Sequence, residues 1–135
     1  MWKAVLCGML AGMSLSGAAM AESPGQADYE RYCASCHGIE GTGHGPMRAV
    51  LTLSPTDLTV LSAENGGVFP LERVVKRIDG RDPLVAHGSP MPVYGTFFDY
   101  GKGVTLELPS GEKIMTTQPV ADLVAYLRGL QAKVE

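Results

Sequence analysis

One five-residue motif constrains this chain more than any other feature: Cys33-Ala34-Ser35-Cys36-His37. Two thiols three residues apart, followed directly by a histidine, form the C-x-x-C-H signature of covalent haem attachment. Each thiol adds across one vinyl group of haem, and the adjacent imidazole binds the iron from the proximal side. The motif therefore predicts one covalent haem c, with Cys33 and Cys36 as its thioether residues and His37 as its proximal iron ligand.

Three other kinds of site use paired cysteines, and the sequence favours none of them. A thioredoxin-like redox pair belongs in a βαβ unit, and the pattern around the motif is not of that kind. A structural zinc site needs a second pair of ligands, yet the only other cysteine is Cys7, in the N-terminal segment. A plain disulfide would leave the adjacent histidine unexplained.

Residues 1–21 have the pattern of a secretory signal peptide. A lysine precedes an apolar run, and residues 19–21 read Ala-Met-Ala, an A-x-A cleavage site. The apolar run is broken by Gly and Ser and is shorter than the ~20 residues of a membrane span. Cleavage after Ala21 would remove Cys7. We therefore expect an exported, periplasmic domain over residues 22–135 with no membrane span.

Composition excludes several classes of protein. The chain has 135 residues, of which 45% are hydrophobic, so it is not a disordered tail. Its formal net charge of −3 argues against a basic nucleic-acid binder. Its 17 Gly and 9 Pro residues follow no collagen-like period and indicate long loops.

The second axial ligand of the iron is predicted to be Met91. It lies between Pro90 and Pro92, whose fixed φ angles stiffen the loop and hold the sulfur in place. A thioether is a soft, neutral ligand that favours Fe(II) and raises the reduction potential. Four other residues remain candidates for this ligand: Met47, Met115, His44 and His87. Ligation by His87 would give the iron two histidine ligands.

The rest of the chain reads as helices separated by loops. A Ser-Pro pair starts a helix over about 24–36, and apolar residues at helical spacing predict another over 70–79. Alternating residues on both sides of a Pro-Ser-Gly-Glu turn predict a small β-hairpin near 103–117. A last helix is expected over 119–130, with Thr117 as its cap. The fold class is therefore mainly α.

The order of these features resembles a class I cytochrome c of the bacterial periplasmic type, over the whole of 22–135. The segments that carry the resemblance are Gly25-x-x-x-Tyr29-x-x-x-Cys33, Gly38 to Gly43, Ser89 to Gly95 and Pro119 to Leu130. The resemblance implies a cytochrome c fold, in which three or more helices wrap round one covalent haem. The hairpin departs from the smallest members of that family and is expected to be an insertion.

The resemblance also implies roles for further residues. A proline carbonyl, best matched by Pro46, would accept a hydrogen bond from His37 Nδ1. Tyr94 would hydrogen-bond a haem propionate or pack against the ring, and Tyr126 would pack on the first helix where Gly25 permits close approach. Four cations would form a solvated face, pair with a propionate or contribute to a docking patch: Arg73, Lys76, Arg77 and Arg81.

Function follows as an expectation from the motif and the resemblance together. We expect a mono-haem electron carrier, not an enzyme, that meets other redox proteins transiently and does not bind nucleic acid. The alternative is a haem-bearing subunit of an oxidoreductase complex, or a haem enzyme or ligand binder with a displaceable sixth ligand. No sequence signal indicates an oligomeric state.

Overall fold

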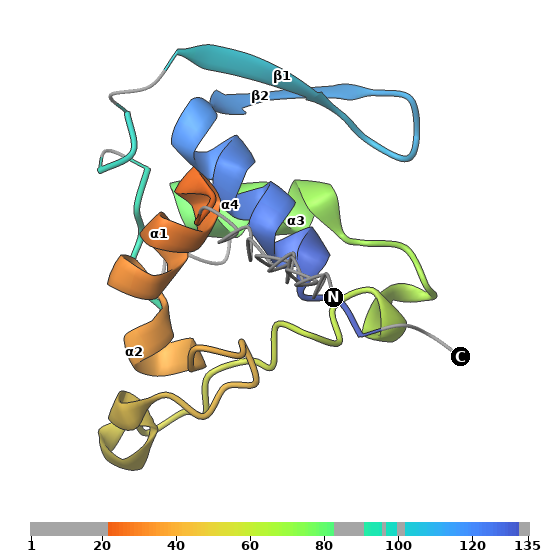
Figure 1. Cartoon of the computed structure of the whole chain (residues 1–135). Helices are drawn as coiled ribbons and strands as arrows, with labels where there is room; N and C mark the ends of the chain where they lie inside the picture. Colours follow the sequence, from red (N-terminus) through yellow and green to blue (C-terminus); the bar gives the residue numbers. More distant parts are fainter. Residues whose placement is uncertain (1–21, 83–90, 96, 100–101, 133–135) are drawn as a thin grey trace, which may run out of the picture.

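The computed structural model describes residues 22–82, 91–95, 97–99 and 102–132. The signal peptide expected over 1–21 and the candidate ligand His87 lie outside these ranges. The elements in chain order are α1 (Pro24–Tyr32), α2 (Ala34–His37), η1 (Pro46–Val50), η2 (Ala63–Asn65), α3 (Leu71–Asp79), β1 (Gly103–Glu107), β2 (Lys113–Thr117) and α4 (Gln118–Gly129) (Figure 1). The predicted mainly helical fold class is confirmed.

The N-terminal helical segment is divided at Cys33, where one continuous helix over about 24–36 was predicted. The hydroxyl of Ser23 accepts a hydrogen bond from the amide of Gln26 at 3.2 Å, which caps α1. Cys33 is both the C-cap of α1 and the N-cap of α2, and its φ angle is −116°. This value lies well outside the helical range. The break turns the short helix α2 relative to α1.

Helix α3 matches its predicted pattern. Its buried residues are Leu71, Val74, Val75 and Ile78. They recur at i, i+3, i+4 and i+7, so they form one apolar stripe that faces the core. Gly80 ends the helix with φ 84°, a left-handed conformation that suits glycine.

Strands β1 and β2 form the predicted hairpin. They pair antiparallel, with Gly103 opposite Thr117 and Glu107 opposite Lys113. Ile114 is buried and its neighbour Met115 is exposed, as expected of a strand with one covered face. Figure 1 shows the hairpin extending over the end of α4 at which β2 runs into that helix. Strand β2 ends and α4 begins at consecutive residues.

Helices α1 and α4 pack at very close range, as the family resemblance implied. A Cβ atom on Gly25 would lie 2.0 Å from the carbonyl oxygen of Asp122, so only glycine fits there without movement of a backbone. Farther along the same contact, the rings of Tyr29 and Tyr126 have centroids 5.1 Å apart. The first and last helices therefore pack directly against each other and bring the two ends of the domain together.

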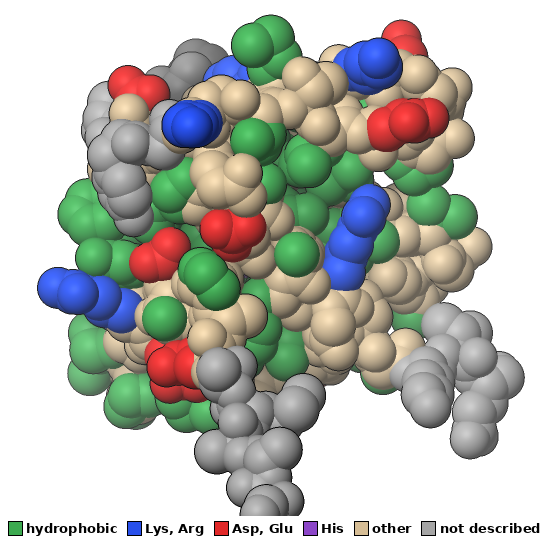
Figure 2. Space-filling model, turned by 45° about the horizontal axis from the view of Figure 1, so that its top comes forward, with side chains coloured by type: hydrophobic (Ala, Val, Ile, Leu, Met, Phe, Trp, Pro, Cys, Tyr) green, Lys and Arg blue, Asp and Glu red, His purple; other side chains and the backbone are tan. Residues whose placement is uncertain are grey.

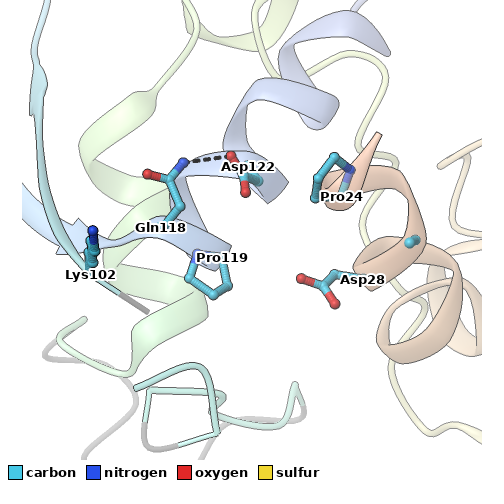
Figure 3. Close-up of a pocket in the computed structure, with 7 residues that line it drawn as sticks. Pro24, Asp28, Lys102, Gln118, Pro119 and Asp122 are labelled. Atoms are coloured by element: carbon cyan, nitrogen blue, oxygen red, sulfur yellow. Dashed lines mark hydrogen bonds between the residues drawn. The ribbon is translucent and has the colours of Figure 1, made fainter. Parts of the chain in front are cut away.

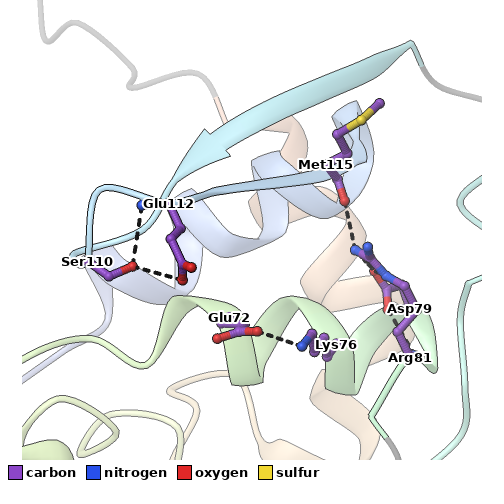
Figure 4. Close-up of polar contacts among 7 residues, drawn as sticks. All are labelled: Glu72, Lys76, Asp79, Arg81, Ser110, Glu112 and Met115. Atoms are coloured by element: carbon purple, nitrogen blue, oxygen red, sulfur yellow. Dashed lines mark hydrogen bonds and ion pairs between the residues drawn. The ribbon is translucent and has the colours of Figure 1, made fainter.

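A polar contact links α3 to the hairpin (Figure 4). The guanidinium of Arg81, just beyond α3, pairs with Asp79 at 2.5 Å and donates to the carbonyl oxygen of Met115 at 2.8 Å.

Thr117 stands at the N-cap position of α4, but its side chain makes no capping hydrogen bond, contrary to the sequence-based expectation. Its buried hydroxyl has no hydrogen-bond partner among the described residues.

Candidate haem site

A cavity of ≈ 830 Å³ lies between the helices and the long loop that follows α2. Its size falls within the range of about 300–1,000 Å³ typical of ligand sites. Its apolar walls come from α3, α4 and the loop before η2: Leu58, Leu61, Val74, Ile78, Leu123 and Leu127. Cys33, Cys36, His37 and Met91 also line it. The structure thus brings the four predicted ligand and attachment residues to one place.

The glycine-rich loop after α2 fixes the end of that helix. The amide of Gly43 donates to the carbonyl of His37 at 2.8 Å, and the amide of Gly45 donates to the carbonyl of Cys36 at 3.0 Å. A Cβ on Gly45 would lie 2.4 Å from the carbonyl oxygen of Ser35. The close approach of loop and helix therefore depends on glycine, and it holds the attachment motif in a defined position.

The imidazole of His37 is buried and oriented by the backbone. Its Nδ1 atom lies 2.9 Å from the carbonyl oxygen of Thr56. Because a carbonyl oxygen only accepts, Nδ1 carries the proton and Nε2 keeps its lone pair for a metal. The partner predicted from the sequence, Pro46, is wrong: Pro46 begins η1, and the later loop supplies the carbonyl instead.

Met91 is partly buried and packs against the core. Three of its rivals do not line the cavity. Met47 and Met115 are 44% and 68% exposed, and the imidazole of His44 is held by the carbonyl of Thr42 at 2.8 Å on the surface. The fourth rival, His87, lies outside the described residues. Among the described candidates, Met91 alone shares the cavity with His37.

Two tyrosines of the cavity are held by backbone carbonyls. The hydroxyl of Tyr29 donates to the carbonyl of Gly38 at 2.6 Å, and that of Tyr94 donates to the carbonyl of Tyr32 at 3.0 Å. Burial raises the pKa of both phenols, so both stay protonated near neutrality. The hydroxyl of Tyr94 is therefore already engaged, which argues against the propionate role and leaves the packing role expected for it.

Burial also acts on the first thiol of the motif. Desolvation, followed in size by the charges of Asp28 and Cys36, raises the pKa of Cys33 to about 12. In the chain without haem this thiol is accordingly neutral at physiological pH. A neutral sulfur suits the low-polarity wall of the cavity.

A second, more open hollow lies between the first turns of α1 and α4 (Figure 3). Asp28 and Asp122 line it, and the amide of Gln118 donates to Asp122 at 2.8 Å. Desolvation, and then the charge of Asp122, raises the pKa of Asp28. Within the described residues, no three His, Cys, Asp or Glu side chains form a group that could hold a metal ion.

The surface carries mixed charge. On the face that Figure 2 shows, Lys and Arg side chains are interspersed with Asp, Glu and hydrophobic side chains rather than gathered by sign. That distribution gives no basic stripe for nucleic acid on this face. Within the part of the chain that the structure describes, no helix has the length and apolar character needed to cross a membrane.

Comparison with known proteins agrees with this site. The family model described as Cytochrome c matches residues 23–131. Searches of curated proteins and of solved structures gave no match. Since the match spans most of the chain, the protein belongs to the cytochrome c family.

Members of this family bind covalent haem c, and the residues of the cavity fit that group. The cavity offers two thiols for attachment, an imidazole whose Nδ1 is held by the carbonyl of Thr56, a thioether sulfur and apolar walls. The protein is thus a haem-binding electron carrier of the cytochrome c family.

Proposed function

We propose that the protein is an exported mono-haem electron carrier with His/Met ligation. Cys33 and Cys36 would form the thioethers, each sulfur adding to one vinyl carbon while the thiol hydrogen goes to the other. His37 would bind the iron through Nε2, and Met91 would bind it through its thioether sulfur. The haem, when bound, supplies the one-electron chemistry between Fe(III) and Fe(II).

One observation carries this proposal. Met91 follows His37 by 54 residues, yet both line the same cavity with Cys33 and Cys36. The hydrogen bond from Nδ1 to Thr56 supports the role of His37, because it fixes the tautomer and the ring orientation that a metal ligand needs.

The surrounding residues would determine which chemistry is possible. Leu58, Leu61 and Leu127 give the cavity apolar walls, which would keep water away from a bound iron. If His37 and Met91 both bind the metal, these side chains would keep O₂ and peroxide from binding it. Electron transfer, rather than substrate turnover, would be the outcome, and transient redox proteins would be the partners.

The first experiment tests attachment and ligation. The purified protein should stain for haem after denaturation, and Cys33→Ala with Cys36→Ala should abolish the stain. The weak red absorption band of ferric His/Met haem should be lost in Met91→Ala. The matched control is Met115→Ala, at a methionine that is 68% exposed and outside the cavity. A band that survives in Met91→Ala would reject Met91 as ligand.

The same sample tests the alternative of a displaceable sixth ligand. Rapid binding of CO or cyanide by the unaltered protein would favour an enzyme or a ligand binder over a carrier. Slow or absent binding is the expected result.

Export has its own test. Residues 1–21 have a signal-peptide pattern, so the haem-bearing protein should be recovered from the periplasm with Glu22 as its first residue. Recovery of the haem protein with residues 1–21 intact would contradict cleavage after Ala21.

A further inference from the structure

Two of the four cations on and after α3 are engaged away from the cavity (Figure 4). Lys76 pairs with Glu72 at 2.5 Å, one turn earlier on the exposed face of α3. Arg81 pairs with Asp79 and donates to the carbonyl of Met115 in the hairpin. Neither side chain lines the cavity, so neither is placed to act on a bound group.

The other two cations, Arg73 and Arg77, do line the cavity. They stand four residues apart, so they lie on one face of α3, beside the buried residues Val74 and Ile78. The guanidinium of Arg77 pairs with Asp82 at 3.1 Å. Arg73 forms no ion pair with any of the described residues. Among the described residues, Arg73 is therefore the cavity-lining cation that has no acidic partner.

The two ends of the cavity differ in chemistry. Of the attachment cysteines, Cys33 is the N-cap of α2 and Cys36 lies within it. Helix α2 lies well apart from α3 in Figure 1. The described residues of the lining include two cations, both on α3, and one acid, Glu64 of η2. A carboxylate in this cavity would thus be attracted to α3 and repelled by η2.

Haem carries its two propionate groups on the edge opposite the vinyl groups. Thioether bonds to Cys33 and Cys36 would fix the vinyl edge near α2, which directs the propionate edge away from it. We propose that Arg73 binds a haem propionate through its guanidinium group. This inference rests on the proposed function, because it needs the haem to be attached at those cysteines.

The expected consequence is on the reduction potential. The side chain of Arg73 is exposed at the cavity wall. A guanidinium–carboxylate pair there is a charge-assisted contact, which two parallel N–H···O bonds can strengthen. It also offsets the negative charge of the propionate, which would otherwise stabilise Fe(III) over Fe(II). Arg73 therefore raises the potential, and its loss lowers it.

The experiment is a spectroelectrochemical titration of the haem-loaded protein. We compare the unaltered protein with Arg73→Gln, Arg73→Lys and the control Lys76→Gln, which removes the same charge from the same helix outside the cavity. Arg73→Gln should lower the reduction equilibrium constant at least threefold, equivalent to about 28 mV for a one-electron couple. Arg73→Lys keeps the positive charge, so its reduction potential should fall by less than half as much as that of Arg73→Gln. Lys76→Gln should give a smaller shift that fades at high salt.

Two results would overturn the assignment of Arg73. Either its glutamine variant has the potential of the unaltered protein, or its shift equals that of Lys76→Gln at every salt concentration. These results are distinct from failure of the proposed function, which would appear as the absence of covalent haem in the unaltered protein before any titration.

Discussion

Replacement of Gly25 by alanine should weaken the contact between α1 and α4. The new Cβ would lie 2.0 Å from the carbonyl oxygen of Asp122 and 2.4 Å from its carbonyl carbon. Both atoms belong to the backbone of α4, so no rotamer change relieves the clash, and the two helices must separate. Overpacking of this kind costs about 1–3 kcal/mol, and a clash with backbone belongs at the upper end.

The intrinsic helix preference of alanine over glycine offsets part of this cost, by ~1 kcal/mol. The net loss of stability is then about 2 kcal/mol, which lowers the Tm of a domain of this size by roughly 8 °C. Thermal unfolding of the haem-loaded protein, followed by far-UV circular dichroism, measures the change.

The chain offers a matched control for this substitution. Gly129 is the last residue of α4, and a Cβ there would meet nothing within 4 Å. Gly129→Ala should therefore keep or slightly raise the Tm, since only the helix preference acts. An equal Tm for the two variants, or a rise in Gly25→Ala, would refute the claim that the close approach of α1 and α4 requires glycine.

Three further substitutions test individual contacts. Burial, and then the charge of Asp122, raises the pKa of Asp28, so its ionised form opposes folding. The protonated carboxyl therefore favours the folded state: this stability is fully present below the pKa of the unfolded chain and is lost as the pH rises through the raised pKa of the folded state. Asp28→Asn should raise the Tm at pH 7 and leave it unchanged near pH 3. Thr117→Val should raise the Tm by removing a buried hydroxyl with no partner in the described structure, although N-cap threonines usually stabilise. Tyr29→Phe removes the 2.6 Å hydrogen bond to Gly38, whose carbonyl keeps a backbone partner, so unfolding by urea should show a loss of ~1 kcal/mol.

Each of these expectations has a contradicting result. A rise in the Tm of Asp28→Asn that is equal at pH 3 and pH 7 would exclude an electrostatic origin of the stabilisation. A lower Tm in Thr117→Val would indicate that the hydroxyl caps α4 after all. An unchanged urea midpoint in Tyr29→Phe would mean that the Tyr29 hydrogen bond contributes no net stability.

The parts of the fold that the sequence could predict are those with local signals. The apolar spacing from Leu71 to Ile78 defines α3, and the alternation on either side of the turn near Ser110 defines the hairpin. The contact of Gly25 with α4 was also predictable, through the family resemblance. Each depends on short-range periodicity or on a motif that many chains share.

The details of the candidate site were less predictable, because they depend on the path of the long loop. Which carbonyl reaches His37 is set by how the loop folds back, and Thr56 carries no side-chain signal for that role. The hydroxyl of Tyr94 could equally have faced a ligand or the backbone, and only the packing of α1 against the segment after Met91 decides between them.

The direct passage of β2 into α4 limits how this region can change in length. The turn around Ser110, between β1 and β2, can gain or lose residues without moving either strand. Strand β2 is different, because no loop separates Thr117 from Gln118. Deleting one residue there would either turn Ile114 and Thr116 outward or rotate α4 by about 100° about its axis. Length variation among relatives should therefore concentrate in the turn and be absent from β2.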